Sequence, residues 1–356
     1  MIIFQVLVMI MLIPPMICSV TYKSCAPEKH CVPYEFCNES YGLDGQFYPE
    51  LNRTFRDHLH CNYREKCCHL KDTLSICRSH NGTLMQQGKC GSRVDLWFHL
   101  HQYTSTKEEA KFGEFPWLVA IYDKGGYLCS GALITPGAVL TAANCVHGKR
   151  KYELRVVAGE WDAAVELEPF AHQTRPVHKL LVHPNYTQSM SHNLALLLIS
   201  HEKPFQLTAH VHVICLPSPE IIHNLRDCYV AGWHLGDFLK NRTLLRRSSL
   251  FVLPRDQCVS KLRMTIFGRH FTLNDTLLCA GGEKDSFVCD DPGAIPLMCL
   301  QSNSNNRFAL IGLLARATNC DGPQLLGVYS NVLLYRKWID LKLNEHDVEL
   351  DRYMIN

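Results

Sequence analysis

From Phe112 onward, short apolar runs alternate along the chain with turn-forming stretches. The runs include "WLVAIYD", "YLCSGALI", "LRVVAG", "LALLLI", "CYVAGW", "FALIGLLA" and "LGVYSNV". About a dozen of them follow one another without intervening helices, a pattern typical of an all-β barrel or sandwich. We therefore expect an all-β domain over residues 111–345.

One segment near the C-terminal end has a different period. In "YRKWIDLKLNEH" the apolar residues Trp338, Ile339, Leu341 and Leu343 recur at helical spacing. This spacing predicts a single terminal helix. Residues 346–356 are expected to form a C-terminal tail.

The first segment, "MIIFQVLVMIMLIPPMICS", is apolar but is broken by Pro14 and Pro15. It is too short and too interrupted for a membrane-spanning helix. Residues 1–19 are typical of a secretory signal peptide, with cleavage expected near Ser19. Because no later run is apolar for 18 residues, we expect no membrane span and a secreted, extracellular protein.

The chain has 18 cysteines, which in an exported protein indicate disulfides rather than zinc ligands. Six of them, spaced C-x5-C-x5-C-x23-C-x5-C-C, fall within residues 25–68. That segment is polar, so it depends on cross-links for its stability. Residues 69–110, which include the charged stretch "STKEEAK", are predicted to be a linker.

Charge and histidine content exclude several functions. The formal net charge is only +2 and no long Lys/Arg run occurs, which argues against a nucleic-acid partner. The 19 histidines occur without an HExxH or paired CxxC motif, so neither a metal site nor a cofactor is expected. Six N-x-S/T sequons support export as candidate glycosylation sites. They are Asn38, Asn52, Asn81, Asn185, Asn241 and Asn274.

Several motifs occur in a fixed order after the linker. They are "GEFPW", "CSGALITPGAVLTAANC", "VVAGEWD", "VHPNY", "NLALLLI", "ICLP", "CYVAGW", "LCAGG", a C-x9-C pair at 289–299, and "GVYSNV". This segment resembles a chymotrypsin-like (S1) serine protease domain, and residues 25–68 resemble a clip domain. The chain is thus similar to the clip-domain serine protease homologues of arthropods. The resemblance implies a double six-stranded β-barrel with a C-terminal helix, preceded by a small disulfide-rich clip domain.

The resemblance also implies eight disulfides. In the barrels and linker these are Cys90–Cys215, Cys129–Cys145, Cys228–Cys299, Cys258–Cys279 and Cys289–Cys320. In the clip module they are Cys25–Cys67, Cys31–Cys61 and Cys37–Cys68. Loss of Cys18 with the signal peptide leaves 17 cysteines, so Cys77 has no assigned partner. It is either a linker thiol with no partner or a local variant pairing, or it forms an intermolecular disulfide.

Proteases of this family cleave amides with a serine nucleophile, a histidine base and an aspartate that orients the base. The three positions fall in "TAAHC", "D-x-ALL" and "GDSGGP". Here they hold Asn144 in "TAANC", Asn193 in "HNLALLLI" and Gly293 in "CDDPGAIPLMC". An amide does not titrate near neutral pH, and glycine has no side chain. We therefore expect a pseudo-protease that lacks the Ser/His/Asp triad.

The surrounding loop departs from the family as well. Asp291 replaces the glycine that donates to the oxyanion, and Pro292 has no N–H. Pro292 also replaces the aspartate that receives the new N-terminus after activation, and "TSTK" at residues 104–107 replaces the activation start. Cleavage of an exposed linker remains open at other basic positions. The candidates are Lys89, Arg93 and Lys107.

The resemblance also implies changes in the substrate groove. Residues 315–317, "ARA", replace the groove wall "SWG", and Phe287 aligns with the floor of the specificity pocket. His192 and His147 are the histidines nearest to the vacated positions in sequence. We expect His192 to point to the opposite face of its strand, because alternate strand residues alternate sides. We expect His147 to lie on a loop.

The sequence thus favours a secreted, non-catalytic protease homologue. The resemblance implies a cofactor or adaptor in an extracellular protease cascade of innate immunity, of the melanization type. Its partners would be extracellular proteases or zymogens, including prophenoloxidase. Two alternatives stay open at this point: a residual or repurposed serine endopeptidase, and an extracellular adhesion or decoy protein.

Overall fold

The computed structural model divides the chain into two compact units, residues 1–86 and residues 87–356. The residues that the structure describes are 24–33, 65–69, 89–93, 109–163, 170–219, 223–233, 244–283, 293–302, 307–318 and 324–348.

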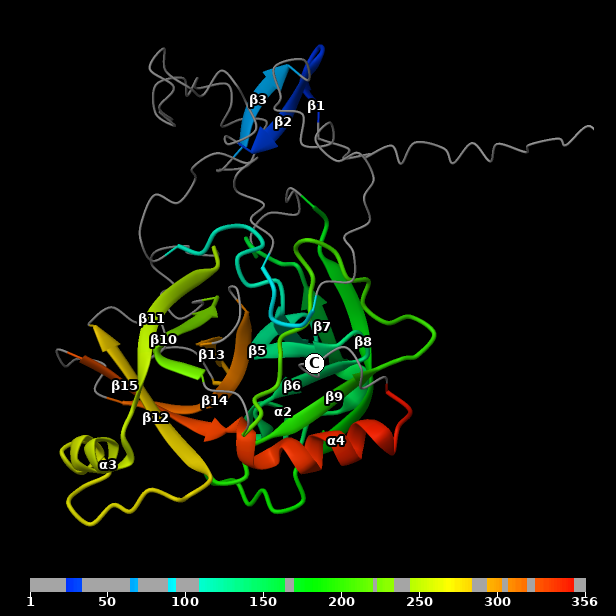
Figure 1. The fold of residues 1–356 in the computed structure, drawn as a ribbon. Helices are drawn as coiled ribbons and strands as arrows, with labels where there is room; N and C mark the ends of the chain where they lie inside the picture. The colour runs from blue at the N-terminus through cyan, green and yellow to red at the C-terminus, as the bar shows by residue number, and fades with distance from the viewer. Residues whose placement is uncertain are drawn as a thin grey trace, which may run out of the picture. The chain divides into compact units, whose positions relative to one another are not determined.

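The second unit is built around two closed barrels, each formed by six antiparallel strands (Figure 1). The first barrel contains β4 (Leu118–Asp123), β5 (Gly126–Thr135), β6 (Ala138–Thr141), β7 (Leu154–Ala158), β8 (Gln173–Val182) and β9 (Ala195–Ile199). The second contains β10 (His223–Gly232), β11 (Arg246–Leu253), β12 (Leu277–Glu283), β13 (Pro296–Gln301), β14 (Phe308–Thr318) and β15 (Gln324–Asn331). Both barrels have the same neighbour order, with the third strand beside the sixth. The predicted double six-stranded β-barrel is confirmed.

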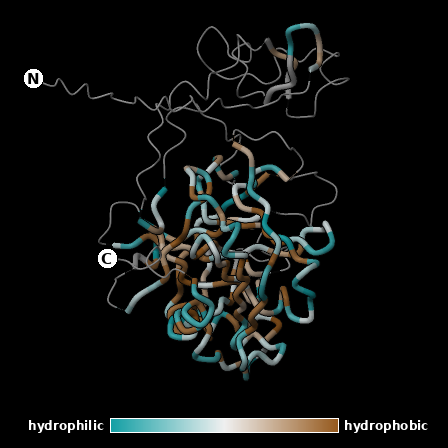
Figure 2. Tube along the Cα trace, turned by 90° about the vertical axis from the view of Figure 1, so that its right-hand side faces the viewer, coloured by the Kyte–Doolittle hydropathy of each residue, from teal (hydrophilic) through white to brown (hydrophobic). Residues whose placement is uncertain are grey.

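The strands follow from the apolar pattern of the sequence. In β9 the side chains of Ala195, Leu197 and Ile199 join the main core cluster, as the period of a strand requires. Leu196 and Leu198 are also buried, so both faces of β9 are covered and the run is continuously apolar. Figure 2 shows the hydrophobic segments concentrated inside this unit and the hydrophilic ones along its outside.

The terminal helix is confirmed as α4 (Arg336–Asn344), which buries Ile339 and Leu343. The expectation that no helix intervenes between the strands is wrong at two places. A short helix, α2 (Ala143–Val146), follows β6, and α3 (Arg255–Arg263) follows β11. The helix α3 buries only Cys258 and Leu262, too few apolar positions to give a helical period in the sequence.

Disulfides tie these elements together. Four occur in the described part of the second unit, and all four are pairs that the resemblance implied. They are Cys90–Cys215, Cys129–Cys145, Cys228–Cys299 and Cys258–Cys279. The bond from Cys145 fixes α2 on β5, and the bond from Cys258 fixes α3 on β12. Such cross-links stabilise the fold mainly by restricting the unfolded chain.

The first unit contains a three-stranded antiparallel sheet of β1 (Ser24–Ala26), β2 (Lys29–Pro33) and β3 (Glu65–His69). The disulfide Cys25–Cys67 links β1 to β3, and Cys68 is disulfide-bonded too. Four expected features involve residues outside the described ones. They are the pairs Cys31–Cys61, Cys37–Cys68 and Cys289–Cys320, and the partner of Cys77.

Candidate functional site

The helix α2 presents one polar side chain at the junction of the two barrels. Ala143, Cys145 and Val146 are buried, which leaves Asn144 as the exposed position of this four-residue helix. The disulfide from Cys145 to Cys129 holds the helix against β5. The backbone therefore fixes where the side chain of Asn144 can reach.

Asn144 and Asn193 bind each other through two hydrogen bonds. The backbone N–H of Asn144 donates to Oδ1 of Asn193 at 2.7 Å, and Nδ2 of Asn193 donates to Oδ1 of Asn144 at 2.9 Å. Asn193 is only 1% exposed, and its own carbonyl accepts a bond from the hydroxyl of Ser330 at 3.3 Å. The N–H of Asn144 requires an acceptor, which fixes the orientation of the Asn193 amide.

Gly293 lies directly beside this amide pair. A Cβ built on Gly293 would lie 3.3 Å from Nδ2 of Asn144 and 3.9 Å from its Oδ1. Gly293 is buried and comes just before β13, so the second barrel supplies it while the first supplies both asparagines. The three residues that the resemblance aligns with a catalytic triad are therefore brought together, although Gly293 is far from the other two in sequence.

The backbone at Gly293 is unsuited to a side chain. Its φ is 120°, a conformation that residues other than glycine rarely adopt. The next residue, Ala294, also has a positive φ of 66°. Its N–H donates to the carbonyl of Leu314 at 3.0 Å, which ties this turn to β14. The turn is thus held in a shape that only glycine accommodates easily.

The chemistry of these three positions follows directly from their atoms. The amides of Asn144 and Asn193 donate and accept hydrogen bonds, but neither takes up a proton near neutral pH. Gly293 offers no oxygen or sulfur to attack a carbonyl. The arrangement can hold two loops and a helix together, and it supplies neither a base nor a nucleophile at these positions.

Other predicted features of the site are only partly described. Asp291, Pro292 and Phe287 lie outside the described residues. Residues 315–317, which the resemblance aligns with a wall of the substrate groove, fall on β14. Within this stretch the exposed Arg316 places its guanidinium 5.8 Å from the ring centroid of Phe267.

Of the two neighbouring histidines, His147 lies in a turn after α2, as expected, whereas His192 does not lie on a strand. His192 precedes β9 in a turn with a φ of 53°, so strand alternation is the wrong reason for its direction. Its ring stacks on His183 with centroids 5.1 Å apart, and its Nδ1 lies 3.3 Å from the hydroxyl of Tyr335. His147 follows α2 and packs edge-on against Tyr186. These rings are engaged with other aromatic side chains.

Part of the expected linker packs on the barrels through more contacts than the implied disulfide Cys90–Cys215 alone. We call residues Cys90–Arg93 the strap. The disulfide Cys90–Cys215 and the hydrogen bond from the N–H of Gly91 to the carbonyl of Val213 at 2.8 Å attach it. The guanidinium of Arg93 lies 3.9 Å from the ring centroid of Phe308. This burial lowers the pKa of Arg93.

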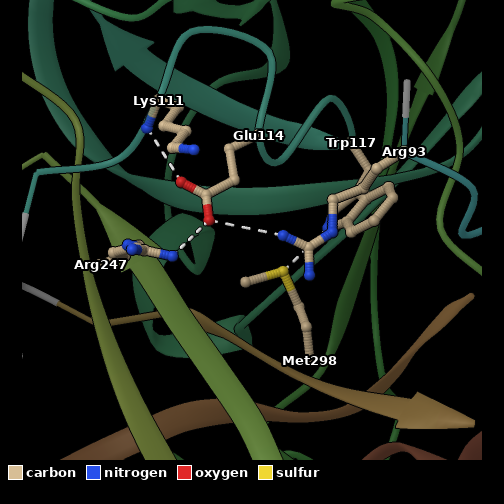
Figure 3. Close-up of polar contacts among 6 residues, drawn as sticks. All are labelled: Arg93, Lys111, Glu114, Trp117, Arg247 and Met298. Atoms are coloured by element: carbon tan, nitrogen blue, oxygen red, sulfur yellow. Dashed lines mark hydrogen bonds and ion pairs between the residues drawn. The ribbon is translucent and has the colours of Figure 1, made fainter. Parts of the chain in front are cut away.

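The carboxylate of Glu114 also holds the strap in place, because it binds Arg93 as well as Lys111 and Arg247 (Figure 3). Its Oε1 lies 3.4 Å from Nη1 of Arg93 and 2.6 Å from Nη1 of Arg247, and its Oε2 accepts the N–H of Lys111 at 2.9 Å. The side chain of Arg93 is only 17% exposed. This contradicts its interpretation as a cleavage position in an exposed linker.

Two of the six sequons fall on described residues. Asn185 follows β8 and Asn274 precedes β12, and both are exposed. The hydroxyl and N–H of Thr276 both donate to Oδ1 of Asn274. The remaining four sequons lie outside the described residues. They are Asn38, Asn52, Asn81 and Asn241.

The described part of the chain contains neither a cluster of metal-ligating side chains nor a membrane-spanning helix. There, no group of three or more His, Cys, Asp or Glu side chains is placed to hold a metal ion. No helix in those ranges is both long and apolar enough to cross a membrane.

Comparisons of the sequence with known proteins identify the family of the chain. The family model described as Trypsin matches residues 105–339, more than half of the chain. The chain is 33% identical over 282 residues to "Phenoloxidase-activating factor 2" of Galleria mellonella, covering 74% of this chain and 92% of that protein. It is 34% identical over 240 residues to "Inactive CLIP domain-containing serine protease A3" of Aedes aegypti, covering 65% and 49%. It is 27% identical over 330 residues to "Inactive CLIP domain-containing serine protease A8" of Anopheles gambiae, covering 86% and 88%.

Two closed six-stranded antiparallel barrels followed by a C-terminal helix define the chymotrypsin-like class of protein. The chain belongs to the trypsin family of S1 serine proteases. Within that family it is similar to insect CLIP domain serine proteases, several of which are named inactive.

Proposed function

We propose that this protein is a secreted, non-catalytic serine protease homologue that acts as a cofactor or adaptor in an extracellular protease cascade of the melanization type. The observation that carries the proposal is the pair of asparagine amides bound to each other beside Gly293. The barrels around it keep the family's disulfides. A framework that is kept while its chemistry is replaced supports binding as the remaining use, since function resides in sites rather than in folds.

The names of two relatives support the cascade and the lack of catalysis. One is named a phenoloxidase-activating factor and another an inactive CLIP domain protease. On this proposal the partners are extracellular proteases or zymogens, including prophenoloxidase. The exposed Asn185 and Asn274 are then glycosylation sites of the exported protein, and residues 1–19 are removed.

Two assays on the mature recombinant protein, freed of other proteases, test the proposal. In the first, the protein is incubated with a fluorophosphonate probe and with peptide substrates, and neither labelling nor hydrolysis is expected. In the second, it is added to prophenoloxidase and its activating protease from insect haemolymph, and phenoloxidase activity should rise. Labelling of one specific residue would favour the endopeptidase alternative. Unchanged phenoloxidase activity, both before and after cleavage of the linker, would count against the cofactor.

A further inference from the structure

A loop after α3 exposes two large apolar side chains. We call residues 263–271 the Met264 loop. Met264 is 80% exposed and Ile266 is 75% exposed, the highest values among the exposed large hydrophobic side chains that the structure describes. Water around such side chains is unfavourable. Exposed apolar groups gathered in one place therefore indicate a contact with another molecule.

The same loop is basic. The exposed Arg263 and Arg269 flank Met264 and Ile266, and Lys261 precedes them in the last turn of α3. From residue 257 to residue 274 the sequence contains no Asp or Glu. Basic residues at the end of α3 also favour the helix dipole. That explanation covers Lys261 and Arg263, but it covers neither Arg269 nor the two apolar side chains.

The Met264 loop is held in one conformation by its own contacts. The hydroxyl of Thr265 donates to the carbonyl of Leu262 at 2.7 Å, and Nε of Arg263 donates to the carbonyl of Phe271 at 3.0 Å. The rings of Phe267 and Phe271 lie 4.6 Å apart and pack on a small core that contains the disulfide Cys258–Cys279. A loop ordered in this way loses little conformational entropy when a partner binds.

The loop also reaches the altered groove wall. The guanidinium of Arg316 on β14 lies 5.8 Å from the ring centroid of Phe267, whose own loop carries the exposed pair. The position where the family has its groove-wall tryptophan therefore adds a further positive charge to the same region. Apolar residues surrounded by arginine are the composition that protein interfaces favour.

We propose that the Met264 loop, together with Arg316, docks an acidic polypeptide segment of a protein partner that carries an apolar anchor residue. The negative charge of the partner is complementary to Arg263, Arg269 and Arg316. Its anchor covers Met264 and Ile266. A membrane surface is a poorer fit, because interfacial binding uses a much longer apolar helix face than two side chains provide. The inference rests on the proposed adaptor function, for which it names the binding surface.

The test measures binding of a fluorescein-labelled synthetic peptide of about a dozen alternating Glu and Leu residues by fluorescence anisotropy. The variants R263E/R269E and M264S/I266S should each weaken binding about tenfold or more, as expected for charged and apolar contacts of an interface. Raising NaCl from about 50 to about 300 mM should also weaken it. The matched control is R150E/Y152S, which changes an exposed basic residue and an aromatic residue that is 70% exposed on the first barrel.

The variants M264S/I266S and R150E/Y152S alter exposed side chains, so their melting temperatures should match that of the parent protein. The variant R263E/R269E also loses the hydrogen bond from Arg263 to Phe271 and should melt slightly lower, so its binding is compared at a temperature where both proteins are folded. Equal loss of peptide binding in the control, or no binding by the parent protein, overturns the inference. Preferential binding to phosphatidylserine vesicles, measured by co-sedimentation, overturns it in favour of a lipid surface. If R263E/R269E still raises phenoloxidase activity fully, the inference fails while the adaptor function stands. If the parent protein binds the peptide but leaves phenoloxidase activity unchanged, only the adaptor function fails.

Discussion

The side chains of Asn144 and Asn193 hydrogen-bond to each other at 2.9 Å, and the backbone N–H of Asn144 completes the pair at 2.7 Å. The residues lie 49 positions apart in sequence. The resemblance to serine proteases aligns these positions with the imidazole and the carboxylate of a catalytic triad. Here two neutral amides make the same connection, so the contact keeps its structural role without proton transfer.

The first prediction concerns the unequal burial of the two asparagines. Replacement of Asn193 by Ala should lower the free energy of unfolding by about 2–3 kcal/mol, because it leaves the N–H of Asn144 without its acceptor inside the protein. Replacement of Asn144 by Ala should cost about 1 kcal/mol, since that side chain is exposed and water can reach Asn193. Urea denaturation followed by tryptophan fluorescence measures both values. A larger loss for Asn144→Ala than for Asn193→Ala would contradict the prediction.

The second prediction concerns restoration of the triad. The variant N144H/N193D/G293S should not react with a fluorophosphonate probe, because serine at residue 293 meets a backbone φ of 120°. Serine in that conformation should lower the free energy of unfolding by about 1–3 kcal/mol. Gel fluorescence of the labelled variant and its melting temperature provide the two measurements.

The control for this experiment is Ala294→Gly, which changes the adjacent residue with a positive φ of 66°. Glycine relieves the positive φ but deletes the buried methyl group of Ala294, so this variant should stay within about 1 kcal/mol of the parent protein. Specific labelling of the triple variant at residue 293 would show that the turn relaxes and that the site is only lightly damaged.

The fold could be predicted from the sequence, and the resemblance supplied the assignment of Asn144, Asn193 and Gly293, which stays a prediction. The cysteines explain why: Cys145 follows Asn144 directly, and the C-x9-C pair fixes the register of Gly293. The strands were predictable because buried faces require apolar residues at a period of two.

Other features depend on contacts that no local pattern records. The helix α3 was missed because its two buried residues, Cys258 and Leu262, are too few to produce a period. Arg93 falls within residues 69–110, where charge and the lack of a buried-strand pattern predict an exposed linker. Its burial depends on Glu114 and Phe308, which are distant in sequence. The φ of Gly293 likewise depends on how its turn packs on β14.

The third prediction concerns the strap. The side chain of Glu114 is only 7% exposed, and it faces the guanidinium groups of both Arg93 and Arg247. Replacement of Glu114 by Gln should lower the free energy of unfolding by about 2–3 kcal/mol, because two partly buried charges lose their counter-ion. Limited trypsin digestion should also cut after Arg93 faster in this variant, which mass spectrometry of the fragments detects.

The control for the strap is Glu345→Gln, which removes an exposed ion pair with Lys342 at the end of α4. Exposed pairs of this kind contribute little, so its unfolding midpoint and its trypsin pattern should match those of the parent protein. Equal rates of cleavage after Arg93 in the parent protein and in Glu114→Gln would show that Glu114 does not hold the strap.

The fourth prediction concerns acid and the buried histidines. Burial lowers the pKa of His183, with a further contribution from His192, and burial also lowers the pKa of His210. An unfolded histidine titrates near pH 6.5, so below that value the unfolded chain binds more protons than the folded protein. The contribution of these two histidines to the free energy of unfolding is therefore complete above about pH 6.5. It falls as the pH decreases toward their pKa values in the folded protein.

A hydrogen bond of His183 also predicts that stability falls in acid. Nδ1 of His183 accepts the N–H of Asn185 at 3.3 Å, so it cannot be protonated without losing that bond.

The unfolding free energy of the parent protein, measured in urea at pH 7.5, 6.5 and 5.5, should decrease steadily. His183→Gln should be less stable at pH 7.5 but show a shallower decrease, because one group that gains a proton on unfolding is gone. His178→Gln, on the exposed side of β8, should retain the slope of the parent protein. Parallel slopes for His183→Gln and the parent protein would rule out His183 as a source of the acid sensitivity.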